Sequence, residues 1–294
     1  MYIFSSNRVK KCTLFLKIFR EWHYRCYALW DKWNEKMSEN DNQKETLKDE
    51  IKRIFSLSED SASNEEIRSR LLDGGKITGT NMCVLICAMV IASVGLNVGS
   101  TAVIIGAMLI SPLMGSILAS AYAGVASDYS LFRKHSIGFG MQILISVTAA
   151  AIYFLLSPVK EPTAELLART GPTFFDVLIA FFGGLAGIIG QTRQDKANTV
   201  IPGVAIATAL MPPLCTCGYS IANGRWDMLL GAGYLFIINT YFIFMSAGII
   251  LSVLKIPKMR DLTPKEWKRR RFRMIVNTII IMLPSIAAVY FMMQ

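Results

Sequence analysis

The chain has 294 residues, of which 53% are hydrophobic, and its mean hydropathy is +0.41. A soluble domain of this length has closer to average apolar usage and lacks apolar runs of about twenty residues. Between Asn81 and Val253 such runs alternate with short polar loops. The sequence therefore predicts an all-α, polytopic helical protein of the inner (cytoplasmic) membrane.

Most of the net positive charge lies in one loop. The formal net charge is +10, and residues 254–273 alone hold nine Lys and Arg residues against Asp261 and Glu266. Positive loops beside membrane spans are retained on the cytoplasmic side and attract anionic lipid head groups. We therefore expect the bilayer and its anionic head groups as partners of this loop, and no nucleic acid.

The sequence contains no pattern of catalytic or metal-ligating residues. Both histidines lie outside the predicted spans, and no zinc-ligand pair, phosphate loop or nucleophile elbow is present. Four of the six cysteines form two close pairs, Cys83 with Cys87 and Cys215 with Cys217. They are either a buried soft-metal site or small buried hydrophobes. We expect neither an enzyme nor a bound cofactor or metal.

The chain before the first span is polar and falls into two parts. Residues 1–36 are basic and aromatic. They form either an interfacial amphipathic helix or a stretch upstream of a true start at Met37, and no cleavable signal peptide is expected. Residues 37–79 predict short cytoplasmic helices, the second of which begins at a cap at Ser63 or Asn64 and stops at Gly74-Gly75.

Seven apolar segments predict about seven transmembrane helices. Six fill a membrane domain at residues 80–253, and the seventh follows the basic loop within residues 274–294. The predicted spans are residues 82–96, 100–126, 137–156, 174–190, 202–222, 229–253 and 274–293. The second span contains Ser111-Pro112 and the fifth contains Pro212-Pro213. Both are expected to be broken, because proline within a helix removes a backbone hydrogen bond.

The broken spans belong to an internal repeat. Alignment of Pro112 with Pro213 matches their apolar residues, and the neighbouring spans match at an offset of 93 residues, as in Val84 and Val177. Repeat one is residues 81–156 and repeat two is residues 174–253. An odd number of spans inverts the second copy, as in many secondary transporters. Convergent small and apolar composition is the alternative explanation.

Charge gives an independent indication of orientation. With the amino terminus inside and every span crossing, Arg133, Arg193 and the basic loop all fall inside, and the carboxyl terminus falls outside. A re-entrant arrangement, in which both broken segments dip and return, remains open.

Functional residues are expected where half-helices meet near the midplane. Broken helices there expose amides that suit an anion and carbonyls that suit a cation. Gln142 and Thr240 add polar groups on the facing spans. The predicted substrate-binding residues are Gly106, Ser111, Pro112, Thr208, Pro212, Pro213, Ser146 and Asn239. Alternatively, Ser146 and Asn239 only bond neighbouring helices.

Two further features have alternative explanations. Small residues spaced by four, including Gly115 with Ala119 and Gly183 with Gly187, indicate close helix packing within the chain or within a homo-oligomer. Asp176, at the outer edge of the fourth span, is either an interfacial helix cap or part of a proton relay.

Two runs resemble a known family. NVGSTAVIIGAMLISPLMGSILA, residues 97–119, and PGVAIATALMPPLCTCG, residues 202–218, are similar to the prokaryotic hydrophobic family called domain of unknown function 389, DUF389. The resemblance covers about residues 81–249. It implies a multi-span membrane protein and no established substrate. Some members of the family carry an amino-terminal soluble domain, which is not evident here.

The sequence thus predicts a transporter-like or channel-like protein that binds or moves a small solute or ion between two inverted repeats. The alternative is a membrane scaffold or lipid-interacting subunit, in which the repeats only pack.

Overall fold

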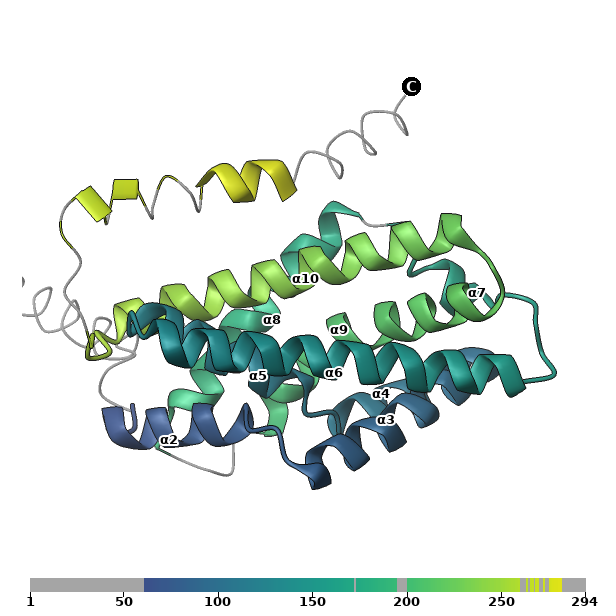
Figure 1. The fold of residues 1–294 in the computed structure, drawn as a ribbon, viewed down its shortest axis with the longest axis horizontal. Coiled ribbons are helices and arrows are strands. Elements are labelled where there is room, and N and C mark those ends of the chain that lie inside the picture. The colour runs from purple at the N-terminus through teal and green to yellow at the C-terminus, as the bar shows by residue number, and fades with distance from the viewer. Residues whose placement is uncertain are drawn as a thin grey trace, which may run out of the picture. The chain divides into compact units, whose positions relative to one another are not determined.

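Helices account for nearly all of the chain that the structure describes (Figure 1). This computed structural model describes residues 61–171, 173–194 and 200–259, with parts of 263–281, and it leaves out the side chains of residues 200–209. The described residues belong to the unit formed by residues 60–294. Predictions for residues 1–60 and 282–294 lie outside the described residues.

The helices agree closely with the predicted segments, and the described residues contain no strand. The bounds are α2 Asn64–Gly74, α3 Gly79–Val98, α4 Thr101–Leu109, α5 Leu113–Val125, α6 Tyr129–Leu156, α7 Ala164–Leu167, α8 Phe174–Thr192, α9 Val200–Ala222 and α10 Trp226–Val253. Ser63 caps α2 as predicted, because its hydroxyl accepts a hydrogen bond from the Glu66 amide.

Four described helices, α3, α6, α8 and α10, are long and apolar enough to cross a membrane. The number rises to five if α4 and α5 together count as one bent span. Such a set of apolar helices is that of a multi-pass membrane protein. The seventh predicted span is described only as far as residue 281.

Helix α6 begins eight residues before the predicted third span. Asp128 caps it, with its carboxylate accepting from the Leu131 amide at 2.9 Å. Arg133, Lys134 and His135 therefore lie in its first two turns, and the prediction that they form a loop is wrong. Hydropathy did not predict this extension, because it shows how far a helix is apolar and not how far its backbone hydrogen bonds continue into charged residues.

The break at Pro112 is confirmed. Helices α4 and α5 are separated by residues 110–112 and bent by 48°. The Ser111 amide bonds the Met108 carbonyl at 3.3 Å, so α4 ends in a tight turn. Pro112 stands directly before the first residue of α5, where a missing amide hydrogen leaves no helical bond unmade.

The predicted break at Pro212-Pro213 is wrong, because α9 continues through both prolines. Every residue from Leu210 to Ser220 is buried, and α9 packs against α3, α4, α5, α6, α8 and α10. This enclosure holds the helix together where its own hydrogen bonds fail. The two prolines still leave the carbonyls of Thr208 and Ala209 without their usual helical donors.

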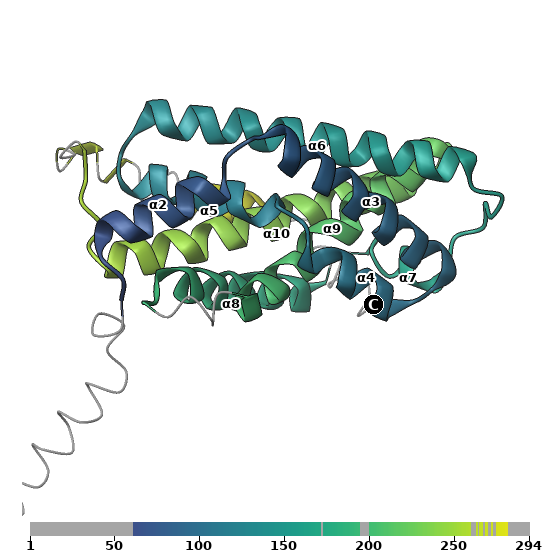
Figure 2. The ribbon, with the colours of Figure 1, turned by 90° about the horizontal axis from the view of Figure 1, so that it is seen from below.

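The helices surround α9 on all sides. Figure 2 shows α6 along one side and α8 along the other, with α9 and α10 between them. Contacts of α9 are close: a Cβ at Gly218 would lie 2.5 Å from the Ala150 side chain on α6. The ring of Tyr219, the next residue of α9, meets Phe154, one turn beyond Ala150 on α6, edge-on with centroids 5.1 Å apart.

Hydrogen bonds show which helix ends lie together. At one end, Asn97 in the last turn of α3 donates to Ser157 after α6 at 2.7 Å, and the Tyr219 hydroxyl near the end of α9 donates to the Lys160 carbonyl. At the other end, the Met259 amide after α10 donates to the Ala126 carbonyl after α5 at 2.8 Å. The chain therefore passes α3, α6 and α9 in one direction and α4–α5 and α10 in the other.

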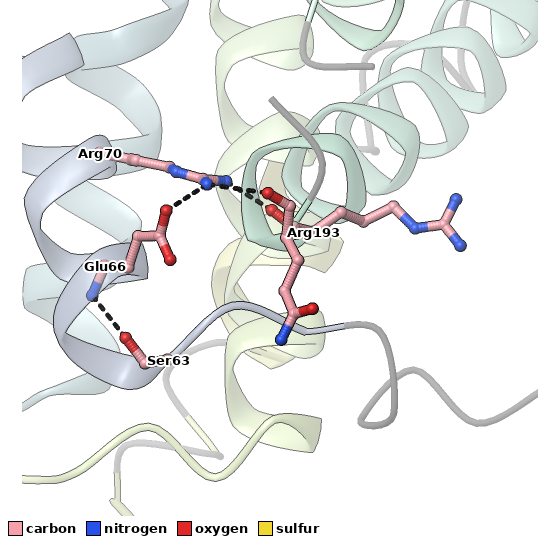
Figure 3. A network of polar contacts seen from close by, with 5 residues as sticks. Ser63, Glu66, Arg70 and Arg193 are labelled. Carbon is pink, nitrogen blue, oxygen red and sulfur yellow. Dashed lines mark hydrogen bonds and ion pairs between the residues drawn. The ribbon is translucent and has the colours of Figure 1, made fainter. Parts of the chain in front are cut away.

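Helix α2 joins the second end to the middle of the bundle. Figure 3 shows Arg70 between the Glu66 carboxylate and the Arg193 carbonyl at the end of α8, and the Arg70 guanidinium donates a hydrogen bond to each. The other end of α2 packs on the first turn of α5, where a Cβ on Gly115 would collide with the Gly74 carbonyl oxygen. The small face of α5 thus serves packing within the chain.

Asp176 forms the predicted helix cap. Its carboxylate accepts from the Thr173 amide and hydroxyl, each at 2.7 Å, in a capping box at the start of α8.

We expect Asp176→Ala to lower the free energy of unfolding by about 1 kcal/mol, because it removes this cap. Thermal unfolding of the purified protein measures the change. Asp227→Ala is the control, since that carboxylate in the first turn of α10 forms only an exposed ion pair with Arg225. Equal losses in both variants would contradict a specific role for the cap.

Candidate functional site

Gln142 lies beside the break in the second span. Helices α5 and α6 form a hairpin, and Gln142 and Pro112 each lie fifteen residues from Ser127 in its turn. Equal distances from the turn place residues of an antiparallel pair at the same level. Gln142 also belongs to the buried stripe of α6 that includes Gly138 and Ser146, so it faces the interior at the level of the break.

Ser146 lies beside the proline pair of α9. Helices α6 and α9 run in the same direction and meet at Ala150 and Gly218. One turn back along each helix, Ser146 is level with Leu214, the residue after Pro213.

Asn239 lies beside α5 and α9. Helices α5 and α10 run in the same direction, with Gly248 opposite Val125 at 4.0 Å. Nine residues back along each helix, Asn239 is level with Ser116. In the α9–α10 hairpin, Asn239 and Ala209 each lie fifteen residues from Gly224. Asn239 therefore lies at the level of the carbonyls that the two prolines leave without helical donors.

These residues form what we call the middle layer of the bundle. Its members share the level of the Pro112 break to within about two helical turns. They are Ser111, Pro112, Ser116, Gln142, Ser146, Pro212, Pro213 and Asn239.

The structure does not bring Ser146 and Asn239 together. Phe139 of α6 stacks on Phe236 of α10 with centroids 6.0 Å apart. From that pair, Ser146 lies seven residues toward one end and Asn239 three residues toward the other. At about 1.5 Å per residue, this pair gives a separation of about 15 Å along the bundle, and the levels of Leu214 and Ala209 on α9 give about 8 Å. Gln142 lies between their levels, so it is the more central residue.

Several side chains of the middle layer are buried without a hydrogen bond. Gln142 is 1% exposed and Ser146 is 0% exposed. Neither amide atom of Gln142 and neither the Ser146 nor the Ser116 hydroxyl has a partner in the described part of the chain. The alternative in which Ser146 bonds a neighbouring helix is therefore not observed. Unpaired buried polar groups of this kind are uncommon and call for an explanation.

Two predicted site residues lie elsewhere or cannot be placed. Gly106 is on an exposed face of α4 and has nothing within 4 Å of a Cβ position, so it lies outside the middle layer as defined here, and its predicted role in binding stays a prediction. Thr208 lies in the first half of α9, whose side chains are outside the described residues.

The cysteines do not gather into one group. Cys83 and Cys87 are exposed on α3, whereas Cys215 and Cys217 are buried in α9. Among the residues that the structure describes, no three potential ligands from His, Cys, Asp and Glu lie close enough to hold a metal ion.

Gln142 and Ser146 of the middle layer are almost wholly buried, whereas Ser111 and Pro112 are partly exposed. A pocket of about 250 Å³ lies between α2, the end of α5, the start of α6 and the residues after α10. It is therefore at one end of the bundle.

The family profile described as "Domain of unknown function (DUF389)" matches residues 108–245. The chain resembles DUF389. This match confirms the resemblance expected from the proline motifs, and the DUF389 segment contains the whole middle layer.

The chain is also similar to a curated protein. The chain is 27% identical over 209 residues to an uncharacterised protein of Methanocaldococcus jannaschii, with 71% of this chain and 63% of that protein covered. The chain thus spans less than two thirds of that relative. No solved structure is significantly similar to the chain.

Sequence reasoning named Gln142 but did not rank it with the site. The repeat drew attention to Ser146 and Asn239, because they correspond at the 93-residue offset. The signal that favours Gln142 is its distance from the turn, which equals that of Pro112. This equal distance can be recognised only when the first residue of α6, and therefore the position of the turn, is known.

Proposed function

We propose that this protein is a transporter-like or channel-like membrane protein that binds a small solute or ion in the middle layer, between two inverted three-helix repeats. The observation that carries the proposal is the buried, unpaired amide of Gln142 beside the Pro112 break. An uncharged polar group within a span is tolerated best when it has a function or a partner.

The directions of the helices support an inverted repeat. α3, α4–α5 and α6 correspond in order to α8, α9 and α10. α6 of repeat one runs opposite to its counterpart α10, and α4–α5 runs opposite to its counterpart α9, as the hydrogen bonds at the two bundle ends indicate. A second copy that enters from the opposite end places ligand groups at the interface of the repeats.

The chemistry of the middle layer favours a cation or a neutral polar solute. α9 continues through its prolines, so it offers carbonyls and no free amide end. The other groups are hydroxyls and amides, and no Lys, Arg, Asp or Glu belongs to the layer. A strongly charged organic solute would lack a counter-charge there.

The proposal includes an orientation. Arg133 and Lys134 at the start of α6 and Lys255 and Lys258 after α10 lie toward the same end as Ala126. Positive charge near span ends favours the cytoplasmic side. We therefore propose that this end of the bundle, with α2, lies on the cytoplasmic side of the inner membrane and that the carboxyl terminus lies on the outer side.

The alternative is a membrane scaffold or lipid-interacting subunit. The burial of Gln142 and Ser146 and the unbroken α9 favour it. In that case the unpaired groups would only weaken the packing.

Thermal-shift screening of the purified protein against monovalent and divalent ions, neutral polar solutes, organic acids and amines distinguishes the two functions. We expect a cation or neutral solute to raise the unfolding temperature, and the response to disappear in Pro112→Ala and Asn239→Leu. Circular dichroism verifies that both variants remain folded. A response that persists in both variants would place the ligand elsewhere and contradict the proposal.

A further inference from the structure

The pocket at the end of the bundle has charged walls from three parts of the chain. Asn64, Glu65 and Arg68 come from the start of α2, Asp128 caps α6, and Lys258 follows α10. The Met259 amide bonds the Ala126 carbonyl at 2.8 Å, so the segment that carries Lys258 is fixed against the end of α5. The pocket is therefore part of the folded bundle.

The charged groups of this pocket form no ion pair among the residues that the structure describes. On α2, Glu66 pairs with Arg70 and Asp73 pairs with Lys76. By contrast, Glu65, Arg68, Asp128 and Lys258 form no ion pair with any residue that the structure describes. Asp128 uses one carboxylate oxygen to cap α6. Two cations and two carboxylates thus face one pocket without neutralising each other directly.

The balance of charge selects the kind of ligand. Two positive and two negative groups give the pocket no net charge, so a simple anion would meet the carboxylates as well as the cations. A zwitterion satisfies both. A phosphate accepts charge-assisted hydrogen bonds from Arg68 and Lys258, and a primary ammonium donates to Glu65 and Asp128.

Position and size agree with a lipid head group. Exposed Arg133 and Lys134 lie one to two turns along α6 from Asp128, and the basic loop begins at Lys255, which is the charge pattern of the membrane–water interface. The volume of about 250 Å³ is below the range of about 300 Å³ and above that is usual for drug-sized ligands.

We propose that this pocket binds the zwitterionic head group of a phospholipid with a phosphate and a primary ammonium, such as phosphatidylethanolamine. The site shares Lys258 with the basic loop of residues 254–273, but it selects a zwitterionic head group and not an anionic one. It is also independent of any ligand in the middle layer, so failure of either proposal leaves the other standing.

Native mass spectrometry of the full chain, extracted from vesicles of defined composition, tests the site. The vesicles contain phosphatidylcholine alone or with phosphatidylethanolamine or phosphatidylglycerol. We expect selective retention of phosphatidylethanolamine, because the methylated ammonium of phosphatidylcholine cannot donate hydrogen bonds. Arg68→Gln with Lys258→Gln should reduce retention about tenfold, and Glu65→Gln should reduce the preference over phosphatidylcholine.

Lys134→Gln is the matched control, since it removes an exposed positive charge at the same end of the bundle without touching the pocket. Unchanged unfolding temperatures in phosphatidylcholine vesicles verify the fold of each variant. Displacement of the lipid by soluble phosphoethanolamine would support the same head-group chemistry with a source in solution. Preferred retention of phosphatidylglycerol, or an equal loss in the Lys134→Gln control, would overturn the proposal.

Discussion

The substitution Gly115→Ala is expected to lower the free energy of unfolding by about 1–3 kcal/mol. A Cβ there would collide with the backbone of Gly74, at the end of α2. Neither partner is a flexible side chain, so relief requires α2 to move away from α5. Thermal unfolding in detergent measures the loss, and increased proteolysis around residue 75 would locate it.

Gly106→Ala is the matched control on the other side of the same break. Nothing lies within 4 Å of the added atom, and alanine favours the helix over glycine by up to about 1 kcal/mol. We therefore expect an unchanged or slightly raised unfolding temperature. A similar loss in both variants would mean that the bend itself, and not the contact with α2, determines the effect.

The second large effect is expected from Gln142→Met. This change removes a buried amide that has no partner among the described residues and keeps a similar volume. We expect the free energy of unfolding to rise by about 1–3 kcal/mol, while any ligand-induced stabilisation disappears. A gain in stability with a loss of binding is the behaviour of a functional group held in an unfavourable environment.

Thr148→Val provides the comparison for Gln142→Met. Thr148 is an exposed residue of the same helix whose hydroxyl bonds the Leu144 carbonyl at 2.8 Å, so the stability and ligand response should change little. If Gln142→Met instead destabilises the protein and leaves the ligand response intact, the amide has a structural role and the scaffold alternative gains support.

The lengths of the apolar segments and the local helix caps could be predicted from the sequence. The spans, the Ser63 cap, the Asp176 cap and the Pro112 break all depend on residues within a few positions of one another. Each follows from hydrophobic burial or from the hydrogen bonds of a helix end. The resemblance to DUF389 rests on the same local motifs.

Features that depend on packing between neighbouring helices could not be predicted from the sequence. The same residue type breaks the chain at Pro112 and leaves α9 continuous at Pro212-Pro213, because α9 is enclosed by six helices. The approach of Gly74 to Gly115 joins residues 41 positions apart in the sequence. The charged pocket likewise combines three distant segments, and no motif in any one of them indicates it.

The difference between the two proline-containing spans makes the halves of the bundle mechanically unequal. α9 is a rigid central rod, since bending it would disturb six neighbours at once. Residues 110–112 already lie between two separate helices, so rotation there breaks few hydrogen bonds. Any conformational change that admits water to the core should therefore occur by rotation of α4 and α5 about residues 110–112, while α9 stays in place.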